Sequence, residues 1–311
     1  MGIFSSLFGG NKTPEENKAK NFDILKYDGI RAMNIGKLTY AIKCFEEATA
    51  IQEDIETLQH QANCYTRVNR LDDARTLLVR ITELAPEQPL TFHALASLCY
   101  IQEDYKGMDE ACQKALALDA DNASTYFLAA KAAIGLSNGI QAIAMLTKAI
   151  VLNDQFTEAY QLRAEVLWAM RQPKDAEADV DKLLEMNPED ESALLMKAEM
   201  LIVGGNEEEA VRLMGEVLAL NPFCEKAYLL KGNYLLAKKE YDAAIGVYDE
   251  ALEINPNFAQ AYHERGRAKL AKGDKQGSME DMKLAIEMAP EQGAAITGEY
   301  NNFEQQKNIP F

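Results

Sequence analysis

Apolar residues recur three and four positions apart along most of the chain, a spacing that predicts amphipathic α-helices. The stretch YDAAIGVYDEALEINP, Tyr241 to Pro256, shows this pattern and ends on a proline, which cannot continue a helix. The same pattern stands 34 residues earlier as EEEAVRLMGEVLALNP, and another 34 earlier as PKDAEADVDKLLEMNP. The chain is therefore predicted to consist of helices that stop at a fixed interval.

Seven units of 34 residues align without a gap, and an eighth unit, one residue shorter, precedes them. The units start at Phe22, Ile55, Pro89, Ala123, Thr157, Glu191, Glu225 and Ala259. Gly36 and Gly273, at the fifteenth place of their units, are expected to end the first helix of each unit. We predict two helices per unit over residues 13–292, a flexible leader at 1–12 and a tail at 293–311.

The eighth place of every unit holds a residue no larger than alanine. Its occupants are Gly29, Ala62, Ala96, Ala130, Ala164, Ala198, Gly232 and Gly266. A position that stays this small predicts two helices that approach too closely for a longer side chain.

One unit shows the order large apolar, small, alanine, aromatic, alanine, proline. Its residues are Tyr228, Gly232, Ala244, Tyr248, Ala251 and Pro256. This order resembles the tetratricopeptide repeat. The resemblance implies an all-α fold, a right-handed superhelical solenoid of about eight helix-turn-helix units. It also implies a scaffold or adaptor that binds a peptide or helix of a partner protein in a concave groove lined by the first helices.

The family's inward places select the residues of that groove. The expected partner-binding residues are His93, Tyr100, Phe127, Lys131, Ile134, Glu165, Trp168, Leu195, Ile202 and Asn233. Trp168, the single tryptophan, is the natural anchor. Over all eight units the inward places carry as many basic as acidic residues, so the predicted groove is neutral. The alternative is that neighbouring first helices cover much of this surface.

A basic residue occupies the seventh place of four successive units, namely Arg163, Lys197, Lys231 and Arg265. The functional interpretation is a track for an acidic peptide. The structural interpretation, which we favour, is that these cations pair with acidic residues of the second helices, such as Asp179 and Asp281.

The formal net charge of -17 argues against nucleic acid as a partner, because its phosphates require clustered Lys and Arg. The five cysteines lack CxxC spacing, which indicates a reducing compartment and predicts a cytoplasmic location. His60 and Cys64 have metal-ligand spacing, but two ligands do not make a zinc site. Without a catalytic grouping or a phosphate-binding loop, we predict no enzyme, no cofactor and no metal.

The two ends of the chain allow a second interpretation, structural assembly. Thr13 and Pro14 begin a capping box, so the first helix is expected to start near Pro14 and to be long. Before it, apolar residues such as Phe4 and Leu7 could touch a membrane through residues 1–10, be disordered, or pack on the first unit. The apolar last helix could build a homo-oligomer through the C-terminal repeat.

Overall fold

The structure is a computed structural model that describes residues 14–289, and this part of the chain contains sixteen helices and no strand. It divides into two compact units, which meet in sequence between Met170 and Arg171. The helices of unit 1 are α1 (Pro14–Asn34), α2 (Leu38–Ile51), α3 (Ile55–Arg67), α4 (Leu71–Leu84), α5 (Pro89–Ile101), α6 (Tyr105–Leu118), α7 (Ala123–Gly135), α8 (Gly139–Leu152) and α9 (Thr157–Ala169). Those of unit 2 are α10 (Pro173–Met186), α11 (Glu191–Gly204), α12 (Glu207–Leu220), α13 (Glu225–Ala237), α14 (Tyr241–Ile254), α15 (Ala259–Lys272) and α16 (Lys275–Met288). The all-α prediction is confirmed.

The predicted repeat boundaries coincide with helix starts. From Ile55 to Ala259, each predicted unit start is the first residue of an odd-numbered helix. The first helix begins at Pro14 and is longer than the others, as the capping box predicts. The predicted leader and tail lie outside the described residues.

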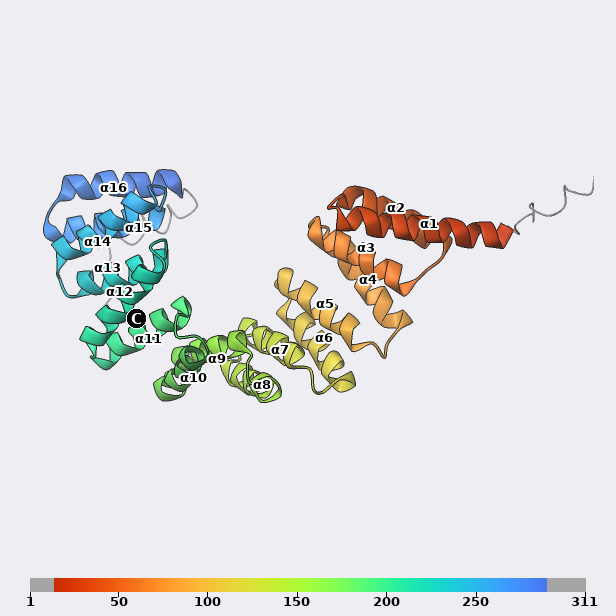
Figure 1. The fold of residues 1–311 in the computed structure, drawn as a ribbon, viewed down its shortest axis with the longest axis horizontal. Helices are drawn as coiled ribbons and strands as arrows, with labels where there is room; N and C mark the ends of the chain where they lie inside the picture. The colour runs from red at the N-terminus through yellow and green to blue at the C-terminus, as the bar shows by residue number, and fades with distance from the viewer. Residues whose placement is uncertain (1–13, 290–311) are drawn as a thin grey trace, which may run out of the picture. The chain divides into compact units, whose positions relative to one another are not determined.

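Within unit 1 and within unit 2, successive helices pack as hairpins in chain order (Figure 1). The first helix of a hairpin contacts the second, as in α5 and α6 or α15 and α16. The second helix then contacts the first helix of the next hairpin, as α6 contacts α7. This order of contacts is that of a helical repeat solenoid.

The first helix of every hairpin is followed, within two residues, by a residue in the left-handed backbone region. Gly36, Gly205 and Gly273 occupy three of these positions, as expected where only glycine avoids a steric cost. The other five repeats place a residue with a side chain there, at φ between 56° and 64°. Those residues are Asn69, Glu103, Ser137, Arg171 and Lys239. The sequence therefore indicated this turn only where glycine occupies it.

The residue at the eighth place of a repeat must be small because of the residue at the twenty-fourth place of the same repeat. A Cβ atom on Gly29 would overlap the ring of Phe45, and one on Gly232 would overlap the ring of Tyr248. Phe45 and Tyr248 are among the largest fully buried side chains of the described residues. The prediction that two helices approach closely here is confirmed.

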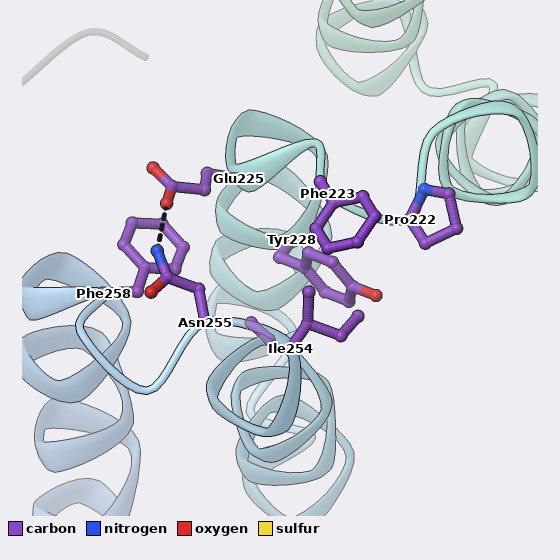
Figure 2. Close-up of a pocket in the computed structure, with 8 residues that line it drawn as sticks. Pro222, Phe223, Glu225, Tyr228, Ile254, Asn255 and Phe258 are labelled. Atoms are coloured by element: carbon purple, nitrogen blue, oxygen red, sulfur yellow. Dashed lines mark hydrogen bonds between the residues drawn. The ribbon is translucent and has the colours of Figure 1, made fainter.

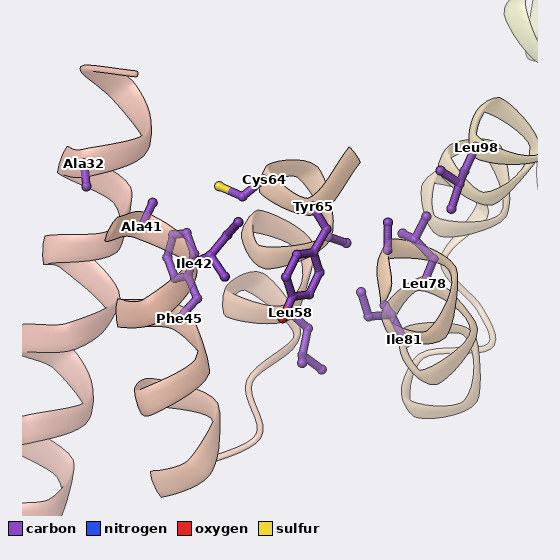
Figure 3. Packing of buried hydrophobic residues seen from close by; sticks show 12 residues of the cluster. Ala32, Ala41, Ile42, Phe45, Leu58, Cys64, Tyr65, Leu78, Ile81 and Leu98 are labelled. Carbon is purple, nitrogen blue, oxygen red and sulfur yellow. The ribbon is translucent and has the colours of Figure 1, made fainter. Parts of the chain in front are cut away.

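The core of unit 1 passes from one hairpin into the next. One apolar cluster includes buried residues of α1 through α5, and Figure 3 shows these side chains meeting between the helices. Ile42 of α2 and Leu58 of α3 belong to it, although they come from different repeats. A second cluster continues from α5 through α6 to α7. Each hairpin thus leaves an apolar face that its neighbour buries.

Unit 2 is built in the same way. One cluster joins α11, α12 and α13, and another joins α13, α14 and α15. Tyr248, fully buried on α14, donates a hydrogen bond of 2.9 Å from its hydroxyl to Asn233 Oδ1 on α13. This bond and the shared core hold α13 and α14 in register.

Candidate functional site

Seven of the ten predicted partner-binding residues lie in unit 1, on three successive first helices. These are His93 and Tyr100 on α5, Phe127, Lys131 and Ile134 on α7, and Glu165 and Trp168 on α9. Helices α5 and α7 contact each other directly, besides contacting the second helix between them. The residues on α5 and α7 therefore belong to one continuous face.

Lys131 lies between two aromatic rings on this face. Its Nζ atom is 4.6 Å from the ring centroid of Tyr100 on α5 and 5.0 Å from that of Phe127 on its own helix. A cation over the face of a ring is attracted by the negative charge of the π system. Within residues 14–289 no carboxylate lies within salt-bridge distance of Lys131. Its charge is held by the rings and is not neutralised.

Exposed apolar side chains surround this cation. Tyr100 is 42% exposed and Ile134 is 37% exposed, on α5 and α7 respectively. Ile134 lies one helical turn after Lys131, and Phe127 one turn before it, so the three share one face of α7. We call Tyr100, Phe127, Lys131 and Ile134 the Lys131 surface.

The deeper residues of this face fix the two helices to each other. His93 Nδ1 lies 3.0 Å from the hydroxyl of Thr125, across the boundary between α5 and α7. Burial lowers the pKa of His93, so the ring is neutral at neutral pH. The ring of Phe127 packs at 5.0 Å on that of Phe156, in the turn before α9. His93 therefore positions the face and contributes no charge to it.

Trp168 and Glu165 lie on α9. Trp168 is half-buried, and Glu165 is exposed and accepts a hydrogen bond of 3.1 Å from Gln161 Nε2. A half-buried tryptophan offers part of its ring to a partner while its packed part keeps it in place.

The three remaining predicted residues lie in unit 2 and do not form a comparable surface. Leu195 is only 7% exposed, because it packs into the cluster of α11, α12 and α13. Its assignment to the groove surface is corrected accordingly. Ile202 is partly buried against the same cluster. Asn233 is exposed, and its side-chain oxygen accepts the hydrogen bond from Tyr248.

Three of the four basic residues at the seventh place are bonded within the fold. Arg265 donates to Asp281 at 2.6 and 2.9 Å and to Asp249 at 2.6 Å, which confirms the predicted pairing with Asp281. Lys197 bonds two carboxylates of α10 at 2.7 and 2.8 Å. Arg163 donates a hydrogen bond of 3.0 Å to a threonine hydroxyl on α8. These three side chains are held by neighbouring helices, which favours the structural interpretation over a basic track.

The pair with metal-ligand spacing takes part in packing. The ring of His60 stacks on that of Phe45 at 5.9 Å, and Cys64 is buried in the core of unit 1. Among the described residues, no three or more His, Cys, Asp or Glu side chains gather as they would around a metal ion. No helix in residues 14–289 combines the length and apolar character needed to cross a bilayer.

Three family models match the chain, and each describes the same repeat. Two models of the tetratricopeptide repeat match residues 167–234 and 259–292, and a TPR repeat model matches residues 232–273. Residues 167–292 are tetratricopeptide repeats (TPRs). A comparison of this TPR protein with curated protein sequences gives no match.

Three solved structures, one of them a tetratricopeptide repeat protein, have a similar fold. A tetratricopeptide repeat protein from Parabacteroides merdae superposes with a TM-score of 0.65 at 21% identity, over 78% of this chain and 96% of its own. PilF from Pseudomonas aeruginosa gives 0.57 at 13% identity, over 70% and 99%. MamA from Desulfovibrio magneticus RS-1 gives 0.52 at 16% identity, over 55% and 97%. At these identities the likeness concerns the fold.

Proposed function

We propose that this TPR protein is a non-catalytic scaffold or adaptor that binds a peptide or helix of a partner protein. The partner would lie on the first-helix face of unit 1, across the Lys131 surface and toward Trp168 on α9. Repeats of this family are typically interaction modules without catalytic activity, which supports the general part of the proposal. A cytoplasmic location stays a prediction from the cysteine pattern.

The observation that carries this proposal is the unneutralised cation of Lys131 between the rings of Tyr100 and Phe127. Contiguous exposed apolar side chains are commonly found where proteins bind each other. Aromatic residues are enriched among the residues that dominate binding energy, because they bury a large area with few rotatable bonds. A partner segment that places an apolar side chain beside a carboxylate would satisfy the rings and the cation together.

Two substitutions test the proposal by quantitative affinity purification of the full chain from its native cells. Trp168→Ala removes the expected anchor, and Lys131→Glu reverses the charge between the rings. We expect both to reduce the recovery of at least one partner about tenfold or more, since central aromatic and charged contacts each contribute about 2 kcal/mol to binding. The thermal unfolding midpoint should stay close to that of the wild type.

A matched control is available on the second helix of the first hairpin. Tyr40 on α2 is also an exposed tyrosine, at 54%. Tyr40→Ala should leave the recovered partners unchanged. If Trp168→Ala and Lys131→Glu also leave them unchanged, the first-helix face of unit 1 is not the binding site.

A second candidate function, self-assembly through the C-terminal repeat, is favoured by one observation. Met279 on α16 is 68% exposed, and Leu284 and Met288 on the same helix are also exposed. Light scattering of the full chain and of Met279→Lys would test it. A mass above that of one chain that falls in the variant supports assembly, and a monomer in both excludes it.

A further inference from the structure

A small pocket in unit 2 lies beside the turn that joins α12 to α13. Its volume is about 280 Å³, and Figure 2 shows the ring of Phe223 beside Pro222 and above the ring of Tyr228. Ile254 and Phe258, from the end of α14 and the following turn, complete the apolar lining. Its volume lies just below the range of pockets that hold small-molecule ligands, so one large side chain suits it better.

Phe223 is unusual for its place in the repeat. It occupies the thirty-third place, where the other repeats that have this turn carry polar or charged residues. Those residues are Glu87, Asp121, Gln155, Glu189 and Asn257. Phe223 is 74% exposed, which makes it one of the most exposed large apolar side chains of the described residues.

The turn itself does not require an aromatic side chain at this place. The backbone N–H of Phe223 donates to Asn221 Oδ1 at 3.0 Å. The same bond forms in other repeats, where Glu189 donates to Asn187 at 3.1 Å and Asn257 to Asn255 at 3.0 Å. The residue two positions earlier therefore makes the turn, and the residue at the thirty-third place is free to vary. The turn in unit 2 does not depend on the phenylalanine side chain.

The margin of the pocket is acidic. Glu225 lines it and accepts a hydrogen bond of 2.7 Å from Asn255 Nδ2, which fixes the carboxylate at the edge (Figure 2). Glu250 precedes the lining residue Ala251 on α14, and its charge, after burial, raises the pKa of Tyr228. Lys226, the next residue on α13, is a basic neighbour of Glu225 and also acts to lower the pKa of Glu199 on α11.

We propose that this pocket, the Phe223 pocket, binds an aromatic or branched aliphatic side chain from a basic segment of a partner protein. The apolar lining would take the side chain, and Glu225 and Glu250 would attract Lys or Arg on either side of it. Such electrostatic complementarity increases the association rate and selects among partners. The Phe223 pocket is separate from the Lys131 surface of unit 1, which is suited to a carboxylate.

The charge of the whole chain argues against a second copy as the occupant. Each copy carries a formal charge of -17, so two copies repel each other unless a large interface offsets that repulsion. A pocket that holds one side chain buries far less area than the roughly 1,200–2,000 Å² of a standard interface. The observations therefore favour a basic segment of another protein.

The proposal is tested by titrating the full chain with short synthetic peptides and following its methyl and aromatic resonances by NMR. The first peptide carries one phenylalanine between two lysine pairs. The second has alanine in place of phenylalanine, and the third has glutamates in place of the lysines. We expect the first peptide to shift resonances of Phe223, Tyr228 and Ile254, and the other two to bind at least about tenfold more weakly.

The chain offers a matched variant, because asparagine occupies the same place in the next repeat, at Asn257. Phe223→Asn should keep the thermal unfolding midpoint of the wild type, since the turn bond comes from Asn221, and should weaken the first peptide about tenfold or more. Lys131→Glu should leave binding of this peptide unchanged, which separates the Phe223 pocket from the proposed function of unit 1.

Several outcomes would overturn the inference. No shift at millimolar peptide, or equal affinity of wild type and Phe223→Asn, would show that the pocket does not bind this class of side chain. Equal binding of the alanine peptide would reduce the interaction to charge alone. A concentration-dependent dimer that Phe223→Asn abolishes would make a second copy the occupant.

Discussion

At the scale of single residues, each hairpin depends on one residue in the left-handed region. This conformation is about 1–2 kcal/mol higher in free energy for a residue with a side chain, because its Cβ atom approaches a backbone carbonyl. Glu103 and Lys239 adopt it at φ of 56° and 64°. The hydrogen bond that closes each turn still forms. Asp104 N–H donates to Cys99 O at 2.9 Å, and Glu240 N–H donates to Leu235 O at 2.9 Å. The backbone of the repeat therefore overrides the local preference of these residues.

We expect Glu103→Gly and Lys239→Gly to stabilise the protein by about 0.5–1 kcal/mol each. Glycine removes the steric cost of the left-handed conformation, and its greater freedom in the unfolded chain offsets only part of that gain. Urea denaturation of the wild type and the variants measures the change. Glu103→Ala serves as control, because it removes the same side chain and keeps the Cβ atom. An equal gain in Glu103→Ala would mean that backbone strain is not the cause.

A buried carboxylate on α15 links stability to pH. Glu264 lies 3.0 Å from His263 Nδ1 and accepts a hydrogen bond of 2.6 Å from Arg267 Nη1. Burial acts to raise the pKa of Glu264, but the hydrogen bond from His263 and the charge of Arg267 outweigh it and hold the pKa below its usual value. Because the pKa is lower in the folded state, the ionised carboxylate stabilises the fold above the unfolded pKa of about 4.3. That stability is lost as the pH falls through the folded pKa.

We therefore expect the wild type to lose more stability than Glu264→Gln between about pH 6 and about pH 3. Urea midpoints measured across this range would give two curves that converge at low pH. Glu253→Gln, at an exposed position of α14, is the control and should follow the wild type. Parallel curves for the wild type and Glu264→Gln would contradict the assignment.

At the scale of helices, the eighth and twenty-fourth places of a repeat vary together in size. Gly29 faces Phe45 and Gly232 faces Tyr248, so these two glycines make room for a ring from the partner helix, whereas Gly266 faces Met282. Where the eighth place is alanine, as at Ala130, the twenty-fourth place holds a smaller side chain, there a leucine. Close packing of the hairpin explains this compensation, since the interior has no room for both larger residues.

We expect Gly232→Ala to destabilise the protein by about 1–3 kcal/mol, because its new methyl group overlaps the ring of Tyr248. Tyr248→Leu also destabilises, since it removes a buried ring and the hydrogen bond to Asn233. The double variant should lose less unfolding free energy than the two single variants lose together, because it recreates the alanine–leucine pairing found at Ala130. A double-mutant cycle by urea denaturation measures this coupling. Strictly additive effects would show that the two positions do not compete for space.

Most of the fold could be predicted from the sequence, because residues that mark helix boundaries recur at the same places of successive repeats. The predicted unit starts from Ile55 to Ala259 coincide with the first residues of odd-numbered helices, and the first described helix begins at Pro14. The left-handed turn was predictable only at glycine, since residue types such as glutamate at Glu103 do not favour this conformation and so do not indicate it.

The candidate site was less predictable, because exposure depends on which neighbour covers a given place. Leu195 occupies an inward place of the repeat, yet it is buried in the core of unit 2. Lys131 was selected, but its position between two rings follows from distances across helices that the pattern does not contain. Phe223 was missed, although comparison of the thirty-third place across repeats would have indicated it.

At the scale of the whole molecule, the repeated hairpins separate stability from binding. Core residues are shared between neighbouring hairpins in both units, so the fold depends on the apolar faces that meet. The exposed side chains of the first helices can then vary without loss of the fold. The net charge of -17 opposes association of copies unless a large interface offsets the repulsion, while Lys131 differs from the other cations of the described residues in lying over two aromatic rings. This division of roles is what the proposed scaffold requires.

The most direct test is photo-cross-linking in native cells, with a benzophenone amino acid placed at Tyr100 of the full chain or, as control, at Tyr40. Both tyrosines are exposed, but only Tyr100 lies on the proposed binding face. We predict discrete adducts with a partner protein at Tyr100, which disappear when Lys131→Glu is added, and none of these adducts at Tyr40. The same adducts at both positions, or adducts at Tyr100 that persist with Lys131→Glu, would contradict the proposed binding surface.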